Sequence, residues 1–291
     1  MEPRPYGPFP FRPITNHLGL KWPGNTRLAF IILPAVEFFP LNSIIPRGSG
    51  AIPDTSAWGR REYGNRVGIF RIGKILKQFG IRGSVGLNSM VCDFCPEVVE
   101  YCLGLDWELV AHAETNAVRL YDYNTEEEAE ECIRRSLDRI ERFSGRRPKG
   151  WIGAGRQQTW NTLDVIAEEG CTYTFDWDND DQPVAMKIND KIVVSMPYGA
   201  GVSDHQAFHS GSTSADFEQM IKDAFDVLYQ ESEASGRVYT ISLHPYIVGL
   251  PHRIGSVERS LEYICKHEGV WFATSEEVTN SFLSQTGGLD I

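Results

Sequence analysis

The sequence predicts an α/β protein with a mainly parallel sheet, because apolar strand-like runs alternate with amphipathic helical runs along the chain. Its 291 residues suffice for one large domain or two small ones. No interior segment is rich enough in proline, glycine and serine to form a linker, so residues 27–291 are expected to form one domain. Residues 1–26 are expected to form an N-terminal arm.

The predicted elements follow one another in regular order. In chain order they are strand 27–33, helix 66–79, strand 81–87, helix 96–103, strand 107–111, helix 125–143, strand 150–152, helix 161–169, strand 171–176, a hairpin of strands 184–188 and 192–196, helix 215–233, strand 238–243, helix 257–267, strand 270–273 and a final helix. Gly80, Gly145 and Gly170 each follow a helical pattern, where glycine ends helices. Thr125 and Glu128 form a capping box at the strongest helix.

The arm holds six of the chain's 16 prolines, with Tyr6, Phe9, Phe11 and Trp22 between them. Proline fixes φ and removes a backbone donor, so an extended conformation is expected. The aromatic side chains need burial, and two arrangements stay open. The arm packs either on its own domain or on a neighbouring subunit of a homo-oligomer.

Composition and charge exclude several classes of function. Hydrophobic residues make up 42% and charged residues 23%, as in globular proteins, and the net charge is −11. Nucleic-acid binding is therefore not expected, because it depends on neutralising phosphates with Lys and Arg. The longest apolar runs, such as residues 28–36, are far shorter than a membrane span, and no apolar signal core follows the N-terminus. We therefore expect a cytoplasmic protein that does not bind membranes.

The six cysteines are scattered and form no disulfide framework. Cys92 and Cys95 have CxxC spacing, but no second ligand pair follows at matching spacing, so a structural zinc site is not expected. Reduced, mostly buried thiols are the expected state.

Polar residues follow five of the predicted strands. They are Glu37, the run from His112 to Asn116, the turn Gly153-Ala154-Gly155-Arg156, the acidic segment from Asp176 to Gln182, and His244-Pro245. Because α/β sheets and barrels place their sites at the carboxyl ends of strands, these side chains are expected to meet in one pocket.

Four segments carry a family resemblance. They are Glu62-Tyr63-Gly64-Asn65-Arg66-Val67-Gly68, Arg147-Pro148-Lys149-Gly150-Trp151, the acidic segment from Asp176 to Pro183, and Leu243-His244-Pro245. With them the chain resembles the polysaccharide-deacetylase superfamily from about Arg27 to the final helix, and in particular its branch of cofactor-independent allantoinases and cyclic-imide hydrolases. The resemblance implies a single distorted (β/α)₇ barrel, hydrolysis of a carbon–nitrogen bond and a homo-oligomer.

The chain departs from the metal-dependent members at two positions. Resemblance to those members places their first carboxylate at Ala35 and their second histidine at Asn116, so the metal ligands would be Glu37, His112 and Asn116. A neutral amide is a weak ligand for zinc, which normally holds three strong ligands. No cofactor is therefore expected, with zinc or another divalent metal at these residues as the alternative.

Without a metal, an activated cyclic amide is the more plausible substrate. An acetamide has a poor leaving group, whereas the nitrogen of an imide or ureide lies beside two carbonyls that delocalise its charge. General acid–base catalysis supplies about 10²–10⁴-fold and an oxyanion site about 10²–10³-fold. The expected reaction is hydrolytic opening of a small cyclic imide or ureide.

The resemblance and the residue chemistry together assign roles. Glu37, with a pKa raised by burial, is the expected general base, His112 orients water or polarises the carbonyl, and His244 protonates the leaving nitrogen. The expected substrate-binding residues are Asn116, which donates to a ring carbonyl, Trp151, which stacks on the ring, Arg156, which holds an oxygen, and Asp181.

Each assignment has a structural alternative. Glu37 could pair with Arg66 or Arg71, the histidines could be satisfied in the core, Arg156 could form a salt bridge, Trp151 could be a core residue, and Asp180 and Asp181 could be a solvated loop or helix cap. Residues 199–214 are expected to form a long surface loop with solvated His205 and His209. Two other functions stay open: a metal-dependent carbohydrate de-N-acetylase, and an inactive barrel that binds a small molecule.

Overall fold

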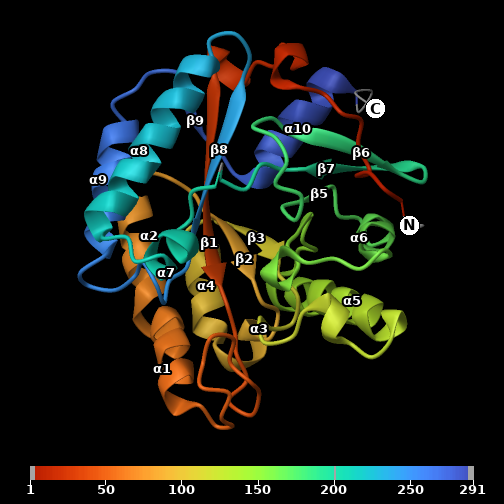
Figure 1. The fold of residues 1–291 in the computed structure, drawn as a ribbon, viewed down its shortest axis with the longest axis vertical. Helices are drawn as coiled ribbons and strands as arrows, with labels where there is room; N and C mark the ends of the chain where they lie inside the picture. Colours follow the sequence, from red (N-terminus) through yellow and green to blue (C-terminus); the bar gives the residue numbers. More distant parts are fainter. Residues whose placement is uncertain (1–3, 200, 288–291) are drawn as a thin grey trace.

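The strands of this computed structural model, which describes residues 4–199 and 201–287, form one curled, mainly parallel sheet (Figure 1). The strands are β1 Leu28–Val36, β2 Ser84–Leu87, β3 Glu108–Ala111, β4 Gly150–Trp151, β5 Tyr173–Thr174, β6 Val184–Ile188, β7 Lys191–Ser195, β8 Arg237–Leu243 and β9 Val270–Phe272. Their order in the described sheet is β6-β7-β5-β4-β3-β2-β1-β8, with β9 also paired to β1. Only the β6–β7 hairpin is antiparallel among these pairs. The predicted α/β barrel-type fold is confirmed.

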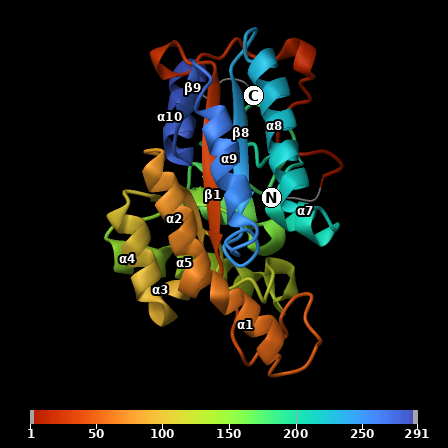
Figure 2. The same ribbon diagram turned by 90° about the vertical axis from the view of Figure 1, so that its left-hand side faces the viewer.

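Helices surround the sheet: most pack on its outer face, but the last helix contributes Val278 and Phe282 to the inner apolar cluster. The helices are α1 Thr55–Tyr63, α2 Ile69–Gln78, α3 Val91–Phe94, α4 Pro96–Gly104, α5 Glu126–Ser144, α6 Thr162–Glu168, α7 Asp204–His209, α8 Ser214–Glu231, α9 Ile254–Ile264 and α10 Ser275–Thr286. A π-helical turn, Gly64–Gly68, joins α1 to α2. Figure 2 shows α2, α9 and α8 in front of β1 and β8, and α8 packs against both β8 and α9.

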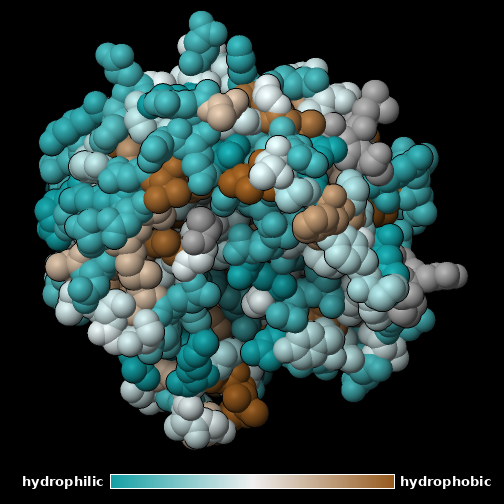
Figure 3. Space-filling model, turned by 45° about the horizontal axis from the view of Figure 1, so that its top comes forward, coloured by the Kyte–Doolittle hydropathy of each residue, from teal (hydrophilic) through white to brown (hydrophobic). Residues whose placement is uncertain are grey.

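Hydrophobic residues are scattered over the face of the molecule that Figure 3 shows. Figure 3 shows one face on which hydrophilic residues predominate and hydrophobic residues form small separate groups. Within the described ranges, no helix has the length and apolar character needed to cross a membrane.

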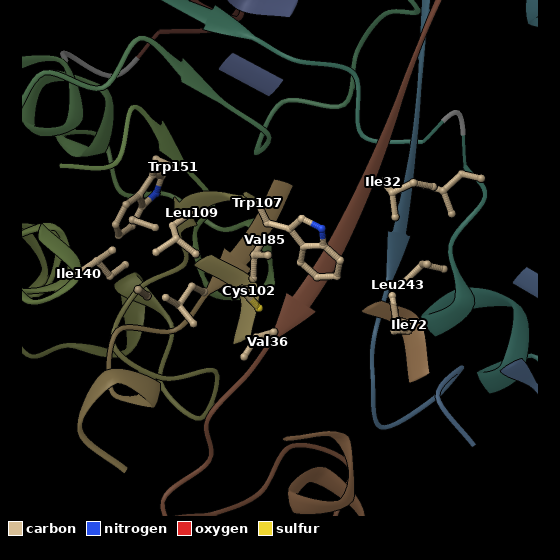
Figure 4. Packing of buried hydrophobic residues seen from close by; sticks show 14 of the residues in the cluster. Ile32, Val36, Ile72, Val85, Cys102, Trp107, Leu109, Ile140, Trp151 and Leu243 are labelled. Carbon is tan, nitrogen blue, oxygen red and sulfur yellow. The ribbon is translucent and has the colours of Figure 1, made fainter. Parts of the chain in front are cut away.

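The core has two layers, one on each side of the sheet. Leu28, Phe30 and Ile32 belong to the cluster under the helices, whereas Ala29 and Ile31 belong to the cluster inside the curled sheet. Successive strand residues point to opposite faces, so a strand buried on both faces is apolar throughout, as all nine residues of β1 are. Figure 4 shows part of the outer layer.

Local capping explains where the long helices begin and end. Thr125 accepts a hydrogen bond from the amide of Glu128 at the start of α5, and Gly145 ends it with φ of 75°. Thr213 forms a full capping box with Asp216 at the start of α8.

The arm contacts its own domain at several points. Leu20 and Trp22 are buried, and the indole N–H of Trp22 donates to the carbonyl of Arg237 at 2.9 Å. Tyr6 and Phe11, in contrast, are 55% and 76% exposed. The arm thus combines an anchored part with an exposed aromatic part.

Three of the described α-helices were not predicted: α1, the four-residue α3 and α7. The sequence analysis assigned residues 199–214 to a loop, and this is wrong because α7 lies within it, capped by the Ser203 side chain on Gln206. The first helix, α1, was missed as well. Both α1 and α7 bury too few apolar residues for a helical period to show, since Ala57 is the one buried residue of α1 and Ala207 the one buried apolar residue of α7.

All six cysteines are free, and four are buried. Burial raises the pKa of Cys92 to about 11 and also raises that of Cys95. Thiols with raised pKa values are poor nucleophiles and poor metal ligands, which fits a packing role.

Candidate active site

A cavity of about 390 Å³ opens at the carboxyl ends of the strands. Five residues named in the sequence analysis line it: Glu37 after β1, His112 and Asn116 after β3, Arg156 after β4, and His244 after β8. The parallel strands bring these distant segments to one edge of the sheet, as expected for this fold class.

Glu37 lies at the centre of this group. Asn65 donates to its backbone carbonyl at 2.9 Å, and the side-chain amide of Asn116 donates to Oε1. Oε2 is buried and has no hydrogen-bond partner among the described residues. One carboxylate oxygen is thus fixed by the protein while the other is left for a ligand or water.

Electrostatics keep Glu37 ionised. Burial alone would raise its pKa, but the interaction with His112 and the charge of His244 outweigh burial and lower the pKa. The expectation that burial raises this pKa is therefore wrong. A carboxylate with a lowered pKa is fully available as a proton acceptor at neutral pH, although a weaker base.

His112 is held in a defined tautomer. Its Nδ1 lies 2.9 Å from the carbonyl oxygen of Ile152, which can only accept, so Nδ1 carries a proton. Its Nε2 lies 3.8 Å from Oε1 of Glu37. At that separation the two atoms form no direct hydrogen bond, so a water molecule that contacts both side chains suits the gap between them.

His244 is paired with a buried carboxylate. Its Nδ1 lies 2.7 Å from Oδ1 of Asp204, and its backbone amide donates to Oδ2 at 2.6 Å. Burial lowers the pKa of His244, but the charge and hydrogen bond of Asp204, helped by Glu37, raise it to about 9. Nε2 of this protonated ring lies 3.7 Å from Oε1 of Glu37, so a proton donor faces the carboxylate.

Asn116 presents an acceptor to the cavity. Because its amide nitrogen donates to Glu37, its Oδ1 points elsewhere and has no partner among the described residues. The sequence analysis expected a donor to a ring carbonyl. The observed orientation instead suits acceptance of a ring N–H.

The ligand set Glu37, His112 and Asn116, which the family resemblance implied, does not suit zinc in this chain. Glu37 and His112 are strong ligands, but Asn116 is a neutral amide whose nitrogen is committed to Glu37. Across residues 4–199 and 201–287, no group of three or more His, Cys, Asp or Glu side chains has metal-binding geometry. A tightly held zinc needs a third strong ligand that this set does not provide.

The π-helical turn explains one of the motif segments. A Cβ on Gly68 would lie 2.1 Å from the carbonyl oxygen of Pro245, and one on Gly64 would lie 2.7 Å from the amide of Tyr246. The two glycines therefore let the turn pack directly on the backbone that carries His244. Asn65, between them, holds Glu37, so this turn positions both groups.

Arg156 combines the two roles considered for it. It lines the cavity, but it also lies 3.3 Å from Asp178 and its guanidinium lies 4.2 Å from the centre of the Tyr198 ring. Its preceding turn is fixed by Asp176, which accepts from the Gly153 amide at 2.8 Å. Arg156 is thus held in place with its charge partly matched.

Trp151 does not line the cavity. It is 0% exposed and belongs to the outer core, where Figure 4 shows it beside Leu109 and Ile140. Its neighbour Ile152 lines the cavity instead. Because successive residues of an extended segment point to opposite sides, the prediction that Trp151 stacks on the substrate is wrong by one position.

Asp181 is also outside the cavity. Its backbone carbonyl accepts from the amide of Val238, and its pKa is raised, chiefly by burial and then by the charge of Asp180. Its neighbour Asp180 pairs with His17 of the arm. The prediction that Asp181 binds substrate is corrected: the acidic segment turns away from the strand ends here, toward the arm.

Several lining or supporting residues were missed, and four of them contact or lie near the charged groups. Asp204 and His205 come from α7, Arg61 from α1, and Tyr246 follows His244. Burial by itself lowers the pKa of His205, and nearby charges carry it to about 3, so the ring is neutral. His205 is half-buried and lines the cavity instead of lying on a surface loop, whereas His209 is exposed as expected. The one available signal was that Asp204 and His205 adjoin in a segment that lacks other charges.

Comparison with known proteins relates this site to a superfamily. No family model matches the chain. A Schizosaccharomyces pombe protein named as a polysaccharide deacetylase is 27% identical and is matched over 90% of this chain and 92% of its own length. The crystal structure of PuuE allantoinase has a TM-score of 0.82 at 26% identity, covering 90% of this chain and 92% of that one. A Pseudomonas aeruginosa structure named as a polysaccharide deacetylase has a TM-score of 0.82 at 25% identity, covering 91% and 93%.

The fold, the strand-end residues and these full-length similarities agree. The chain is therefore similar, over about nine-tenths of its length, to proteins named as polysaccharide deacetylases and to an allantoinase, and it shares their fold.

Proposed function

We propose that the protein is a hydrolase that opens a small cyclic imide or ureide at a ring C–N bond without a metal. The observation that carries the proposal is the ionised Glu37 beside a protonated His244, with Nε2 and Oε1 3.7 Å apart. The pKa of Glu37 is lowered and that of His244 is raised, so this adjacent pair supplies one base and one acid. The allantoinase similarity supports a ring substrate.

In the proposed mechanism, Oε2 of Glu37 takes a proton from a water that Nε2 of His112 orients. The water oxygen bonds to the ring carbonyl carbon, and the tetrahedral intermediate forms. Nε2–H of His244 gives its proton to the ring nitrogen as the C–N bond breaks and its electron pair moves to nitrogen. The proton that Glu37 took from water then passes to His244. The product is the opened ring, with a carboxylic acid at one end and the released amide or ureide nitrogen at the other.

Asn116 and the leaving group favour an imide or ureide over a simple amide. The free Oδ1 matches the N–H between two ring carbonyls. Charge on that nitrogen is delocalised, so acid–base catalysis of about 10²–10⁴-fold covers more of the barrier than it would for an acetamide.

The test is a panel of succinimides, hydantoins and allantoin with product identification by mass. The expected result is gain of one water by at least one ring. The Glu37→Gln variant should lose turnover but keep ligand affinity, while the exposed Glu100→Gln variant should match the native protein. Unchanged turnover by Glu37→Gln removes Glu37 as base, and turnover that depends on stoichiometric metal removes the metal-free mechanism.

Carbohydrate de-N-acetylation is the second candidate. Two of the similar proteins are named as polysaccharide deacetylases. A groove of about 550 Å³, lined by Tyr121, Tyr123, Trp160 and Trp177 among others, shares Tyr121 with the catalytic cavity, and aromatic faces suit sugar rings. Release of acetate from N-acetylated oligosaccharides, lost with chelators and restored by zinc, would favour this function.

A further inference from the structure

The catalytic cavity is rich in positive charge although the chain carries a net charge of −11. Its lining includes four arginines, Arg47, Arg61, Arg119 and Arg156, but two carboxylates, Glu37 and Asp178. Arg156 already pairs with Asp178. Within the described part of the chain, the other three arginines form no salt bridge. The cavity therefore attracts anions.

Arg61 is the best placed of these arginines. It comes from α1, and its guanidinium carbon lies 4.9 Å from the centre of the Tyr246 ring and 5.4 Å from that of Phe39. One terminal nitrogen donates to the carbonyl of Pro46 at 2.8 Å. These contacts hold the guanidinium in place without neutralising it, because aromatic faces and a carbonyl carry no full negative charge.

One N–H group of the Arg61 guanidinium lacks a hydrogen-bond acceptor among the described residues. This group is Nε–H, which is buried. A buried donor without an acceptor costs stability, and an arginine with free N–H groups in a fixed plane matches a carboxylate. A ligand oxygen is the acceptor that the described protein groups do not supply.

Arg61 lies on the acid side of the reacting centre. Its charge acts on both His244 and Tyr246. Its partner Pro46 adjoins Arg47, which donates to Nε2 of His205 at 2.5 Å. A group bound here is therefore next to the end of the substrate at which the ring nitrogen is released.

We propose that Arg61 binds a carboxylate carried by the substrate, so that the substrate is an anionic cyclic imide or ureide; this rests on the proposed ring-opening function. Ring opening also creates a carboxylate, on the attacked carbon beside Glu37. The same arginine could bind that product group instead, so the two sources of the carboxylate must be separated by experiment.

The kinetic test compares hydantoin-5-acetate with its methyl ester, which has the same ring but no charge. The native protein should prefer the carboxylate, and Arg61→Gln should lower kcat/KM for it by about 10- to 100-fold, mainly through KM, because a charged hydrogen bond is lost. The ester should change less than about threefold. Arg61→Lys, which keeps the charge, should fall between the two.

The control is Arg60→Gln, the same substitution at the exposed neighbouring position of α1, which should leave both substrates unchanged. Circular dichroism establishes that each variant is folded. Equal losses for acid and ester, or no preference in the native protein, would overturn the assignment.

Calorimetry with the Glu37→Gln variant gives a second readout that does not depend on turnover. The inference is supported if Arg61→Gln weakens binding of hydantoin-5-acetate at least tenfold and leaves binding of the ester unchanged. This result would support it even if no ring is opened and the proposed function fails. If Arg61 affects binding of the ring-opened product of the ester but not of the acid substrate, the carboxylate belongs to the product and the inference is wrong. Absence of binding by the acid also refutes it.

Discussion

Replacing Asp204 with asparagine should convert His244 from a charged to a neutral side chain near neutral pH. Asp204 accepts from both Nδ1 and the backbone amide of His244, at 2.7 and 2.6 Å. Burial opposes the charged ring, and Asp204 provides the principal effect that raises the pKa above its ordinary value of 6.5 to about 9. Without the carboxylate, burial dominates and the pKa should fall to about 6.5 or below.

The size of the effect follows from these two values. With a pKa of about 9, roughly 97% of His244 is protonated at about pH 7.5, whereas with a pKa of about 6.5 roughly 10% is protonated. The variant should therefore lose about tenfold in kcat/KM at that pH from protonation alone, and it should recover part of the loss at about pH 6.

The assay is the pH profile of kcat/KM for any ring that the native protein opens. The alkaline limb should move from about pH 9 to about pH 6.5 or lower, and an NMR titration of His244 should show the same shift. Asp223→Asn, an exposed change on α8, is the control and should move neither. An alkaline limb that stays in place in Asp204→Asn would refute His244 as the acid.

Three further outcomes are expected. Gly68→Ala places a methyl group 2.1 Å from the carbonyl oxygen of Pro245, so it should lower the unfolding free energy by about 1–3 kcal/mol and reduce kcat. The control Gly104→Ala, with open space around it, should do neither. Equal melting temperatures for the two variants would contradict this packing. The raised pKa of His244 should contribute up to about 3 kcal/mol of stability, which is fully present below about pH 6.5 and is lost as the pH rises through about 9. Denaturation midpoints that do not fall over this pH range would contradict this contribution. Asn116→His supplies a third strong ligand and should raise the affinity for zinc at least tenfold, measured by competition with a zinc indicator. An unchanged zinc affinity would contradict the explanation that Asn116 weakens the ligand set.

The sequence predicted elements well where local chemistry marks their ends. The caps of α5, Thr125 and Gly145, and the apolar run of β1 are visible in the sequence and recur in the structure. The helices α1 and α7 are held mainly by tertiary contacts, and they carry Arg61 and Asp204. The same weakness of local pattern therefore hid both the helices and the two side chains that they bring to the candidate site.

The strand-end rule found the positions of the site but not their orientation. It placed Glu37, His112, Asn116, Arg156 and His244 correctly around the cavity. It could not tell which side of a two-residue strand faces inward, because that depends on the pairing of β4 with its neighbours. Nor could it give the direction of the Asn116 amide, which is decided by the single hydrogen bond to Glu37.

The roles proposed for His112 and His244 differ because the Nδ1 atom of each ring has a different partner. Oε1 of Glu37 lies within 3.8 Å of both imidazole Nε2 atoms, so proximity alone does not distinguish the two histidines. Ile152 offers His112 a neutral carbonyl, whereas Asp204 offers His244 a carboxylate, whose charge and hydrogen bond outweigh burial and raise the pKa of His244. Since the residue that follows β4 and the first residue of α7 supply these partners, the proposed division into a water-orienting ring and an acid depends on the fold. A relative that keeps both histidines but lacks a carboxylate at position 204 should therefore have the same motif without the same acid.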